Sequence, residues 1–276
     1  MDPRLASSRL HDDVDRLQAQ AALSWPREQA ALEALGLRDG MSIVELGSGP
    51  GFITEALLTA LPNAWITAVE LDPRMCAVAR DRLPPHVADR VDIVEASALF
   101  TGLPDDAFDF VLGRLLFQHL AAPELCASEC WRLLRPGGRV AVIDSDDDLG
   151  GVVRPRLAVM DALAQRVRQI QALHSGDRHV GRKLWRLLAD AGFHDVDLGV
   201  IAYHSDELGL EAFLPQYEPE RYRRLVAPGL VTADEWASYA RAYDEFVAAP
   251  EAYILQLLLL ASGRKPPALD VATIGR

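Results

Sequence analysis

The sequence predicts an α/β fold built on a doubly wound, mostly parallel sheet. Short apolar runs rich in β-branched residues alternate with segments whose apolar residues recur at helical spacing, the pattern of parallel strands joined by crossover helices. The chain has 276 residues, enough for one large domain with a sizeable core. A single α/β domain with insertions is therefore the expected architecture.

The first half of the chain contains the clearest elements. Strands are expected at 42–46, 65–71, 91–96, 108–113 and 138–145, with helices between them at about 51–61, 73–83 and 123–134. Asp72 can cap the second of these helices, and Pro73 fits its first turn, where a missing N–H costs nothing. Gly137 and Gly138 are typical of a helix stop.

After residue 150 the pattern becomes mainly helical. Helices are expected at about 152–173, 181–193, 208–226 and 232–248, and strands at 196–205 and 252–261. The long insertion between these two strands is interpreted as a lid, because structured insertions at a sheet edge often cover a ligand. The expected segments are an N-terminal helical cap 1–38, a core 39–205 with a cap helix at about 152–175, a lid 206–250, a last core strand 251–263 and a tail 264–276.

Composition argues against several classes of protein. The formal net charge of −12 repels polyanions, so nucleic acid is not expected as a partner. The longest apolar run, 253–261, is too short to cross a membrane, and the N-terminus lacks the apolar core of a secretory signal, so a cytoplasmic location is expected. Cys76, Cys126 and Cys130 form no metal or disulfide pattern. Cys126 and Cys130, four residues apart on one helix face, are expected as small buried side chains. Monomer and homodimer both remain open.

The segment "VELGSGPGF", residues 44–52, has the glycine-rich turn that joins a strand to a helix at ligand sites. Its glycines follow G-x-G-x-G, and Phe52 stands where a dinucleotide site has its third spaced glycine. Glu70 ends the next strand, where a carboxylate can accept hydrogen bonds from both hydroxyls of a ribose. Adenosine without a pyrophosphate fits both observations.

With "AVELDPRM", "LPDDAFDFVLGRLLFQHL" and "RLLRPGGRVAVID" added to this loop, the chain resembles the class I S-adenosylmethionine-dependent methyltransferases. The likeness covers about 20–205, is strongest over 40–145, and is closest to the small-molecule group that includes ubiquinone/menaquinone and natural-product enzymes. It implies a seven-stranded Rossmann-like sheet whose last strand is antiparallel. It also implies S-adenosylmethionine as cofactor, S-adenosylhomocysteine as product, and a small-molecule acceptor, such as an aromatic or polyketide-like secondary metabolite.

The resemblance implies a set of cofactor residues. Glu45 orients the loop, Glu70 holds the ribose, and Leu71 packs on the adenine. Ser97 stands where the group usually has an acid for the adenine amino group. The other implied contacts are Gly47, Ser48, Gly49, Ala98, Leu99, Gly113, Arg114 and, from the N-terminal segment, Gln20. Arg114 has a structural ion pair as its alternative role.

The acceptor side is less readable. His119 is the first candidate general base, with a packed structural histidine as the alternative, and His174 is a second candidate. Candidate substrate neighbours are Asp144, His179, Tyr203 and Tyr217. The acidic run 144–148 has the pattern of a solvated loop, so no metal is expected.

Two other functions remain open at this stage. One is a non-methylating cyclisation or rearrangement on the same cofactor-binding fold. The other is a non-catalytic cofactor-binding subunit. Product mass separates the first from methylation, because only methylation adds a methyl group to the acceptor.

Overall fold

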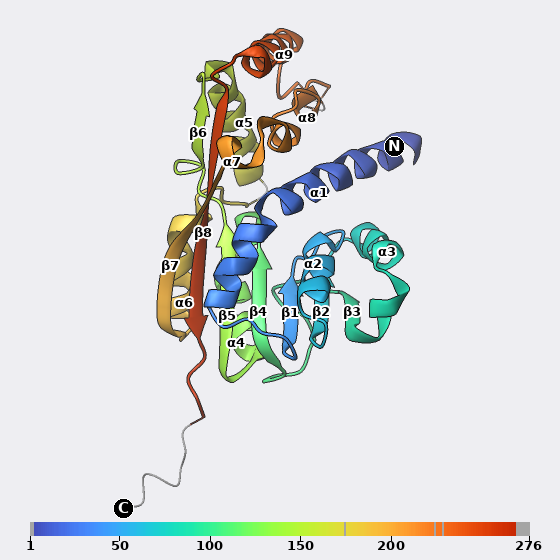
Figure 1. Ribbon diagram of the computed structural model, residues 1–276, viewed down its shortest axis with the longest axis vertical. Coiled ribbons are helices and arrows are strands. Elements are labelled where there is room, and N and C mark those ends of the chain that lie inside the picture. The colour runs from blue at the N-terminus through green and yellow to red at the C-terminus, as the bar shows by residue number, and fades with distance from the viewer. Residues whose placement is uncertain (1–2, 174, 224, 228, 269–276) are drawn as a thin grey trace, which may run out of the picture.

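A computed structural model describes residues 3–173, 175–223, 225–227 and 229–268. Within them, one eight-stranded sheet forms the centre of the protein, with helices on both faces (Figure 1). The strands are β1 (Ser42–Leu46), β2 (Trp65–Glu70), β3 (Val91–Glu95), β4 (Phe108–Arg114), β5 (Leu134–Asp144), β6 (Gly151–Arg154), β7 (His194–His204) and β8 (Tyr253–Arg264). The α/β class and the mostly parallel sheet with an antiparallel last strand are confirmed. Within these ranges the sheet has eight strands rather than the expected seven, because β6 adds a strand beside β8.

The parallel half of the sheet follows the order β3-β2-β1-β4-β5. Its central strands are apolar on both faces and buried, as expected for strands covered by helices on each side. From β1 the chain goes outward to β2 and β3 on one side, and then returns to β4 and β5 on the other. The strand order therefore reverses between β1 and β4, and ligands of such sheets bind at the carboxyl ends of strands at this point.

The antiparallel half is built on the long strand β8. β7 pairs along one side of β8, and β5 and then β6 pair along the other. The prediction of a helix from residue 152 was wrong at its start, because Gly151–Arg154 pairs with 253–256 as β6. The two adjacent valines in this segment favour a strand, which the partner strand makes possible.

The α-helices are α1 (Pro3–Ala34), α2 (Phe52–Ala60), α3 (Pro73–Arg82), α4 (Pro123–Leu133), α5 (Ala158–Leu173), α6 (Leu184–Asp190), α7 (Ser205–Leu208), α8 (Glu220–Arg223) and α9 (Ala233–Ala248). One core cluster packs α1 and α2 on one face of the sheet, and another packs α4 and α6 on the other. Cys126 and Cys130 are buried, as expected, and Cys76 is buried as well.

Helix α1 bends as it passes over the sheet (Figure 1). Pro26 lies inside the helix, where it has no N–H to donate to the preceding turn and its ring presses on that turn. The C-terminal half of α1 packs on the core through Leu32, which is fully buried. The N-terminal half extends past the carboxyl ends of the strands.

Of the two helix ends predicted from local residues, the start of α3 at Asp72 is confirmed and the end of α4 at Gly137 and Gly138 is wrong. Asp72 caps α3 as predicted, since its Oδ1 accepts a hydrogen bond from the backbone N–H of Arg74 at 2.9 Å. Helix α4 ends at Leu133, before Gly137 and Gly138, which lie within β5. A Cβ on Gly138 would stand 2.9 Å from the carbonyl oxygen of Arg135. This glycine therefore allows a tight bend in the strand rather than ending the helix.

The expected lid is less regular than the sequence suggests. In place of one helix at 208–226 there are short helical turns at Ser205–Leu208, Leu210–Ala212, Leu214–Gln216 and Glu220–Arg223. Gly209 separates the first two turns, and glycine does not favour a continuous helix. The lid and α5 share a cluster made of Leu163, Tyr222, Val231 and Tyr239. Of the expected tail, Arg264 ends β8, and 269–276 lie outside the described residues. Among the described helices, none is long and apolar enough to cross a membrane.

Candidate functional site

The glycine loop lies at the point where the strand order reverses. Gly47, Gly49 and Gly51 all have positive φ, at 70°, 56° and 81°, a conformation that glycine adopts without strain. A Cβ on Gly47 would stand 2.8 Å from Leu116 Cδ1, and one on Gly51 would stand 3.1 Å from the Ala79 Cβ. The loop therefore needs glycine for backbone conformation and for close packing.

Glu70 connects the glycine loop to the end of β2. Its Oε2 accepts a hydrogen bond from the Gly49 N–H at 2.8 Å, and its Oε1 accepts one from the Asp72 N–H, also at 2.8 Å. The N–H groups of Gly47 and Ser48 donate to the Val69 carbonyl. Ser48 is only 7% exposed, and its hydroxyl has no hydrogen-bond partner among the described residues. A buried polar atom without a partner inside a ligand-binding loop fits a contact that the ligand itself completes.

Glu45 is buried beneath the loop and accepts a hydrogen bond from Thr54 Oγ1 at 2.5 Å. Burial raises its pKa to about 7, and the carboxylates of Glu70 and Glu28 add to the effect. This hydrogen bond connects the end of β1 to α2, on either side of the glycine loop.

The ends of β2 and β3 form the expected adenine side. Leu71 is 67% exposed, which leaves a large apolar side chain beside Glu70 without a protein cover. The Ser97 Oγ accepts a hydrogen bond from the Leu99 N–H at 3.2 Å, and Ala98 is buried between them. The Ala96 N–H donates to the Glu70 carbonyl at 3.0 Å, so the two loops are adjacent.

Helix α1 reaches the end of β4 through an ion pair. Arg114 Nε lies 2.7 Å from Glu28 Oε2, with the two side chains 9% and 0% exposed. Arg114 Nη2 also donates to Ser24 Oγ at 2.8 Å, and that hydroxyl donates to the Gln20 carbonyl at 3.1 Å. Arg114 thus has the structural ion pair that the sequence left as its alternative role. Gly113, beside it, packs against the Phe117 ring.

Asp144 and His119 lie at the carboxyl ends of β5 and β4. Asp144 is fully buried and accepts hydrogen bonds from the N–H groups of Ser145 and Gln118, and burial raises its pKa to about 7. His119 keeps an exposed surface, although burial by surrounding groups lowers its pKa, as do the cations Arg178 and Arg16. A histidine that is neutral near pH 7 can accept a proton, which is the requirement for a general base.

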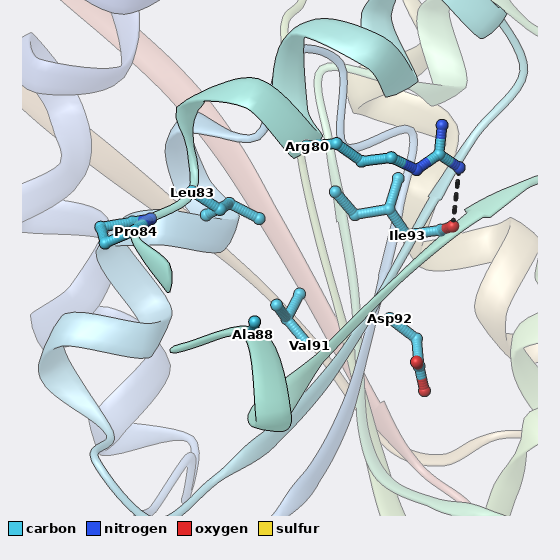
Figure 2. A pocket seen from close by; sticks show the side chains of 7 residues that line it. All are labelled: Arg80, Leu83, Pro84, Ala88, Val91, Asp92 and Ile93. Atoms are coloured by element: carbon cyan, nitrogen blue, oxygen red, sulfur yellow. Dashed lines mark hydrogen bonds between the residues drawn. The ribbon is translucent and has the colours of Figure 1, made fainter. Parts of the chain in front are cut away.

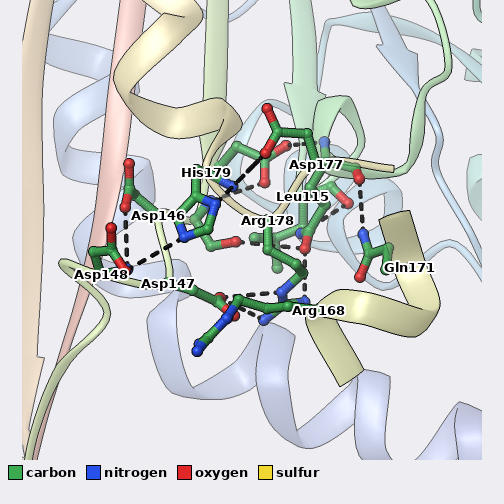
Figure 3. Close-up of polar contacts among 12 residues, drawn as sticks. Leu115, Asp146, Asp147, Asp148, Arg168, Gln171, Asp177, Arg178 and His179 are labelled. Carbon is green, nitrogen blue, oxygen red and sulfur yellow. Dashed lines mark hydrogen bonds and ion pairs between the residues drawn. The ribbon is translucent and has the colours of Figure 1, made fainter. Parts of the chain in front are cut away.

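A polar network connects His119 with Gln171 of α5 and with Arg178 in the loop that follows α5. Figure 3 shows Gln171, Arg178 and Asp147 of this network. Gln171 Nε2 lies 3.3 Å from His119 Nδ1 and donates to the Gln118 carbonyl at 2.7 Å. Arg178 Nη1 donates to Gln118 Oε1 at 2.8 Å, and its Nε donates to Asp147 at 3.0 Å. The network fixes the segment around His119. His174 lies outside the described residues.

His179 points into a group of acidic side chains (Figure 3). Its ring atoms lie 3.4 Å from Asp148 and 3.8 Å from Asp177. Ligand atoms of Asp146, Asp148 and His179 lie within 4.8 Å of one another, a spacing that a cation could use. Arg182 donates to both oxygens of Asp146 and to Asp148, so a guanidinium already supplies the positive charge there.

The two predicted substrate tyrosines lie near each other, one on β7 and one on the lid. Tyr203 is 4% exposed and stacks on Phe213 with ring centroids 5.9 Å apart, and burial raises its pKa. The Tyr217 hydroxyl accepts a hydrogen bond from Gln256 Nε2 at 3.0 Å, while the Tyr217 carbonyl accepts one from the Tyr239 hydroxyl. The charges of Glu28 and Arg114 act on the Tyr203 hydroxyl, so Tyr203 is close to the ion pair.

A cavity of about 220 Å³ lies elsewhere, at the amino end of β3 (Figure 2). Its walls include Leu83, Ala88 and Val91, and Arg80 donates a hydrogen bond to the Ile93 carbonyl at its rim. Because β3 is parallel to β1, this cavity is at the opposite end of the strands from the glycine loop. It holds none of the predicted site residues.

Two residues of the site on α1 escaped the sequence analysis. Ser24 and Glu28 follow Gln20 at intervals of four, so all three share one face of α1. That polar face was a usable signal. Their partner Arg114 is 86 positions from Glu28 in the chain, and no spacing rule brings the two together.

The methyltransferase domain family matches residues 44–142, the segment from β1 to β5. An uncharacterised 37.1 kDa transposon protein of Streptomyces fradiae is 31% identical over 69% of this chain and 54% of its own length. The demethylmenaquinone methyltransferase of Thermus thermophilus is 33% identical over 49% of this chain and 60% of its own length. The chain spans about half the length of the first curated relatives that it matches.

Solved structures share the fold at lower identity. One is a phosphoethanolamine N-methyltransferase of Haemonchus contortus in complex with phosphomonomethylethanolamine and S-adenosylhomocysteine. The two structures align with a TM-score of 0.56 and 19% sequence identity, and the alignment covers 88% of this chain and 53% of the other. Another is a (4+2)-cyclase, with a TM-score of 0.52, 21% identity, and 93% and 81% covered. The same fold thus occurs in proteins named for different reactions.

Proposed function

Since the chain belongs to the class I S-adenosylmethionine-dependent methyltransferases, we propose that it transfers the methyl group of S-adenosylmethionine to a small-molecule acceptor. The observation that carries this proposal is the glycine loop, with its three positive-φ glycines, the Glu70 carboxylate and the unpartnered Ser48 hydroxyl. When bound, S-adenosylmethionine supplies a methyl group already activated by its sulfonium. Catalysis then depends mainly on holding the acceptor in line with that methyl group.

The residues present fit this cofactor. Glu70 keeps lone pairs for the ribose hydroxyls besides the two backbone donors that it already binds. Leu71 offers an open apolar surface for the adenine, and Ser97 to Leu99 lie beside it. Gly47, Ser48 and Gly49 give a bare backbone for the methionine end, near Gly113. The Gln20 carbonyl is connected through Ser24 to Arg114, the residue after Gly113.

The acceptor side centres on His119. Its lowered pKa favours the neutral ring, which can take the proton of a hydroxyl acceptor as the methyl group is transferred. Gln171 and the Gln118 segment hold the ring in place. Tyr217 is partly exposed where the lid meets β7, with the buried Tyr203 near it, and an aromatic side chain there suits an aromatic or polyketide-like acceptor.

Mass spectrometry of products tests this function. The purified protein is incubated with methyl-labelled S-adenosylmethionine and a panel of phenolic, polyketide-type and amine compounds, and Glu70→Ala is the matched negative control. Transfer of the label to a small molecule, lost in the control, is the expected result. Cofactor binding without label transfer across the panel contradicts methylation.

A cyclisation on this fold is the second candidate, favoured by the likeness to the (4+2)-cyclase. Its signature is a product with the same mass as its substrate, formed with the cofactor unchanged. A non-catalytic cofactor-binding subunit would instead bind the cofactor and give neither product.

A further inference from the structure

The ion pair between α1 and the end of β4 stands at the centre of the candidate cofactor site. Gly113 pairs with Leu46 in the β1·β4 register, so Arg114 stands beside Gly47, the first residue of the glycine loop. Arg114 holds Glu28 through Nε at 2.7 Å and Ser24 through Nη2 at 2.8 Å. Both oxygens of Glu28 are thereby brought to the point where the strand order reverses.

One oxygen of this pair is unsatisfied. Glu28 is 0% exposed, its Oε2 faces Arg114, and its Oε1 has no hydrogen-bond partner among the residues that the structure describes. The buried hydroxyl of Ser48 also has no partner there. A buried oxygen without a hydrogen-bond partner destabilises the folded state by more than a typical hydrogen bond stabilises it. This penalty is larger for a charged group. The two atoms flank the reversal point, Ser48 after β1 and Glu28 opposite the end of β4.

The charge of this region favours a cation. Glu28, Glu45 and Glu70 bring three carboxylates, while Arg114 is the cation that faces Glu28 and Glu45. The three acidic groups are near enough for Glu28 and Glu70 each to raise the pKa of Glu45. An ammonium group placed among them would supply both a charge and N–H donors.

We propose that Glu28 Oε1 binds the ammonium group at the methionine end of the cofactor, and that Arg114 and Ser24 position this carboxylate. The proposal rests on the proposed function, since it requires S-adenosylmethionine as the ligand. Helix α1 then becomes part of the cofactor site, and Glu28 is a binding residue rather than only a structural partner of Arg114. The Ser48 hydroxyl is placed for the carboxylate of the same methionine end.

Calorimetry with two ligands tests the role of Glu28. The ligands are S-adenosylhomocysteine and its analogue that lacks only the α-amino group. A charge-assisted hydrogen bond predicts that the wild-type protein prefers the amino ligand by at least about tenfold. In Glu28→Gln the amide oxygen can still accept from Arg114 Nε, while an NH₂ group replaces Oε1. The preference should then fall to within about threefold.

Glu33→Gln is the matched control, because Glu33 lies on the same helix, is exposed, and accepts a hydrogen bond only at the surface from Gln29. It should keep the wild-type preference. Glu28→Asp keeps the negative charge, but its shorter side chain moves the carboxylate oxygen away from the ligand. It should lose less of the preference for the amino ligand than Glu28→Gln does. If Glu28→Gln does not fold, Glu28→Asp is the variant that tests the proposal.

The outcomes separate the two proposals. A Glu28 variant that weakens both ligands equally and keeps their ratio shows a structural role and overturns the assignment. A wild-type preference below about threefold overturns it without any variant. If the wild-type protein binds neither ligand, the proposed function fails as well.

Discussion

Replacing Glu70 by Gln tests the cofactor site most directly. The substitution keeps the size of the side chain but turns one of two hydrogen-bond acceptors into a donor. Each oxygen of Glu70 now accepts a backbone N–H at 2.8 Å, one from Gly49 in the loop and one from Asp72 at the start of α3. The variant therefore loses one of these contacts, places two N–H groups face to face, and removes the charge offered to the ribose.

The expected loss is that of one charge-assisted hydrogen bond, about 1.5–3 kcal/mol. This corresponds to about a 10–150-fold rise in the Kd of S-adenosylmethionine. Isothermal calorimetry measures this Kd directly. The wild-type protein should bind the 2′-deoxy and 3′-deoxy cofactors more weakly than the intact cofactor. The variant should bind all three with nearly the same Kd.

Glu95→Gln is the matched control for Glu70. Glu95 pairs with Glu70 across the β2·β3 register and ends its own strand, yet its side chain is exposed. Its Kd should stay at the wild-type value. A Kd for Glu70→Gln within twofold of wild type would refute the reasoning, because it would remove the carboxylate from the site.

Three further predictions follow from the same geometry. His119→Ala should lower kcat for a hydroxyl acceptor by about 10²–10⁴-fold with cofactor affinity kept, whereas the exposed His86→Ala should change neither; equal kcat values would remove the base. Both Gly47 and Gly137 have a positive φ, but a Cβ on Gly47 would stand 2.8 Å from a side chain, whereas one on Gly137 would enter open space. Gly47→Ala should therefore lower the free energy of unfolding, measured in urea, by more than Gly137→Ala. The reverse order would contradict the packing argument. Burial raises the pKa of Asp144 to about 7, so the folded state keeps a proton that the unfolded chain releases near pH 4. The contribution of Asp144 to the free energy of unfolding therefore falls as pH rises from about 4 to 7, by up to about 4 kcal/mol. The stability of Asp144→Asn relative to wild type should therefore increase over that range, and a constant difference would show that the carboxyl is ionised throughout.

The core of the fold follows from local patterns that do not depend on distant contacts. The central parallel strands β1, β2 and β4 are apolar because both faces are covered, so their runs are visible without knowledge of their partners. Asp72 and Pro73 mark the start of α3 through chemistry confined to one helix turn. In contrast, β6 forms only because the start of β8 pairs with it, and this partner lies about a hundred residues further on in the chain. Context of this kind overrides a helical pattern.

By itself the sequence determined the donor side of the site, because that side is contained in one strand, one glycine turn and the carboxylate at the next strand's end. Glu45, Gly49 and Glu70 are near each other wherever such a unit folds, since parallel neighbours align their carboxyl ends. Only the tertiary structure decided that Arg114 is held by Glu28 from α1, with one buried carboxylate oxygen that has no hydrogen-bond partner among the described residues. The physical reason is that burying a charge requires a partner in space, and the chain supplies it from a helix whose position is set by packing across the sheet and not by sequence spacing.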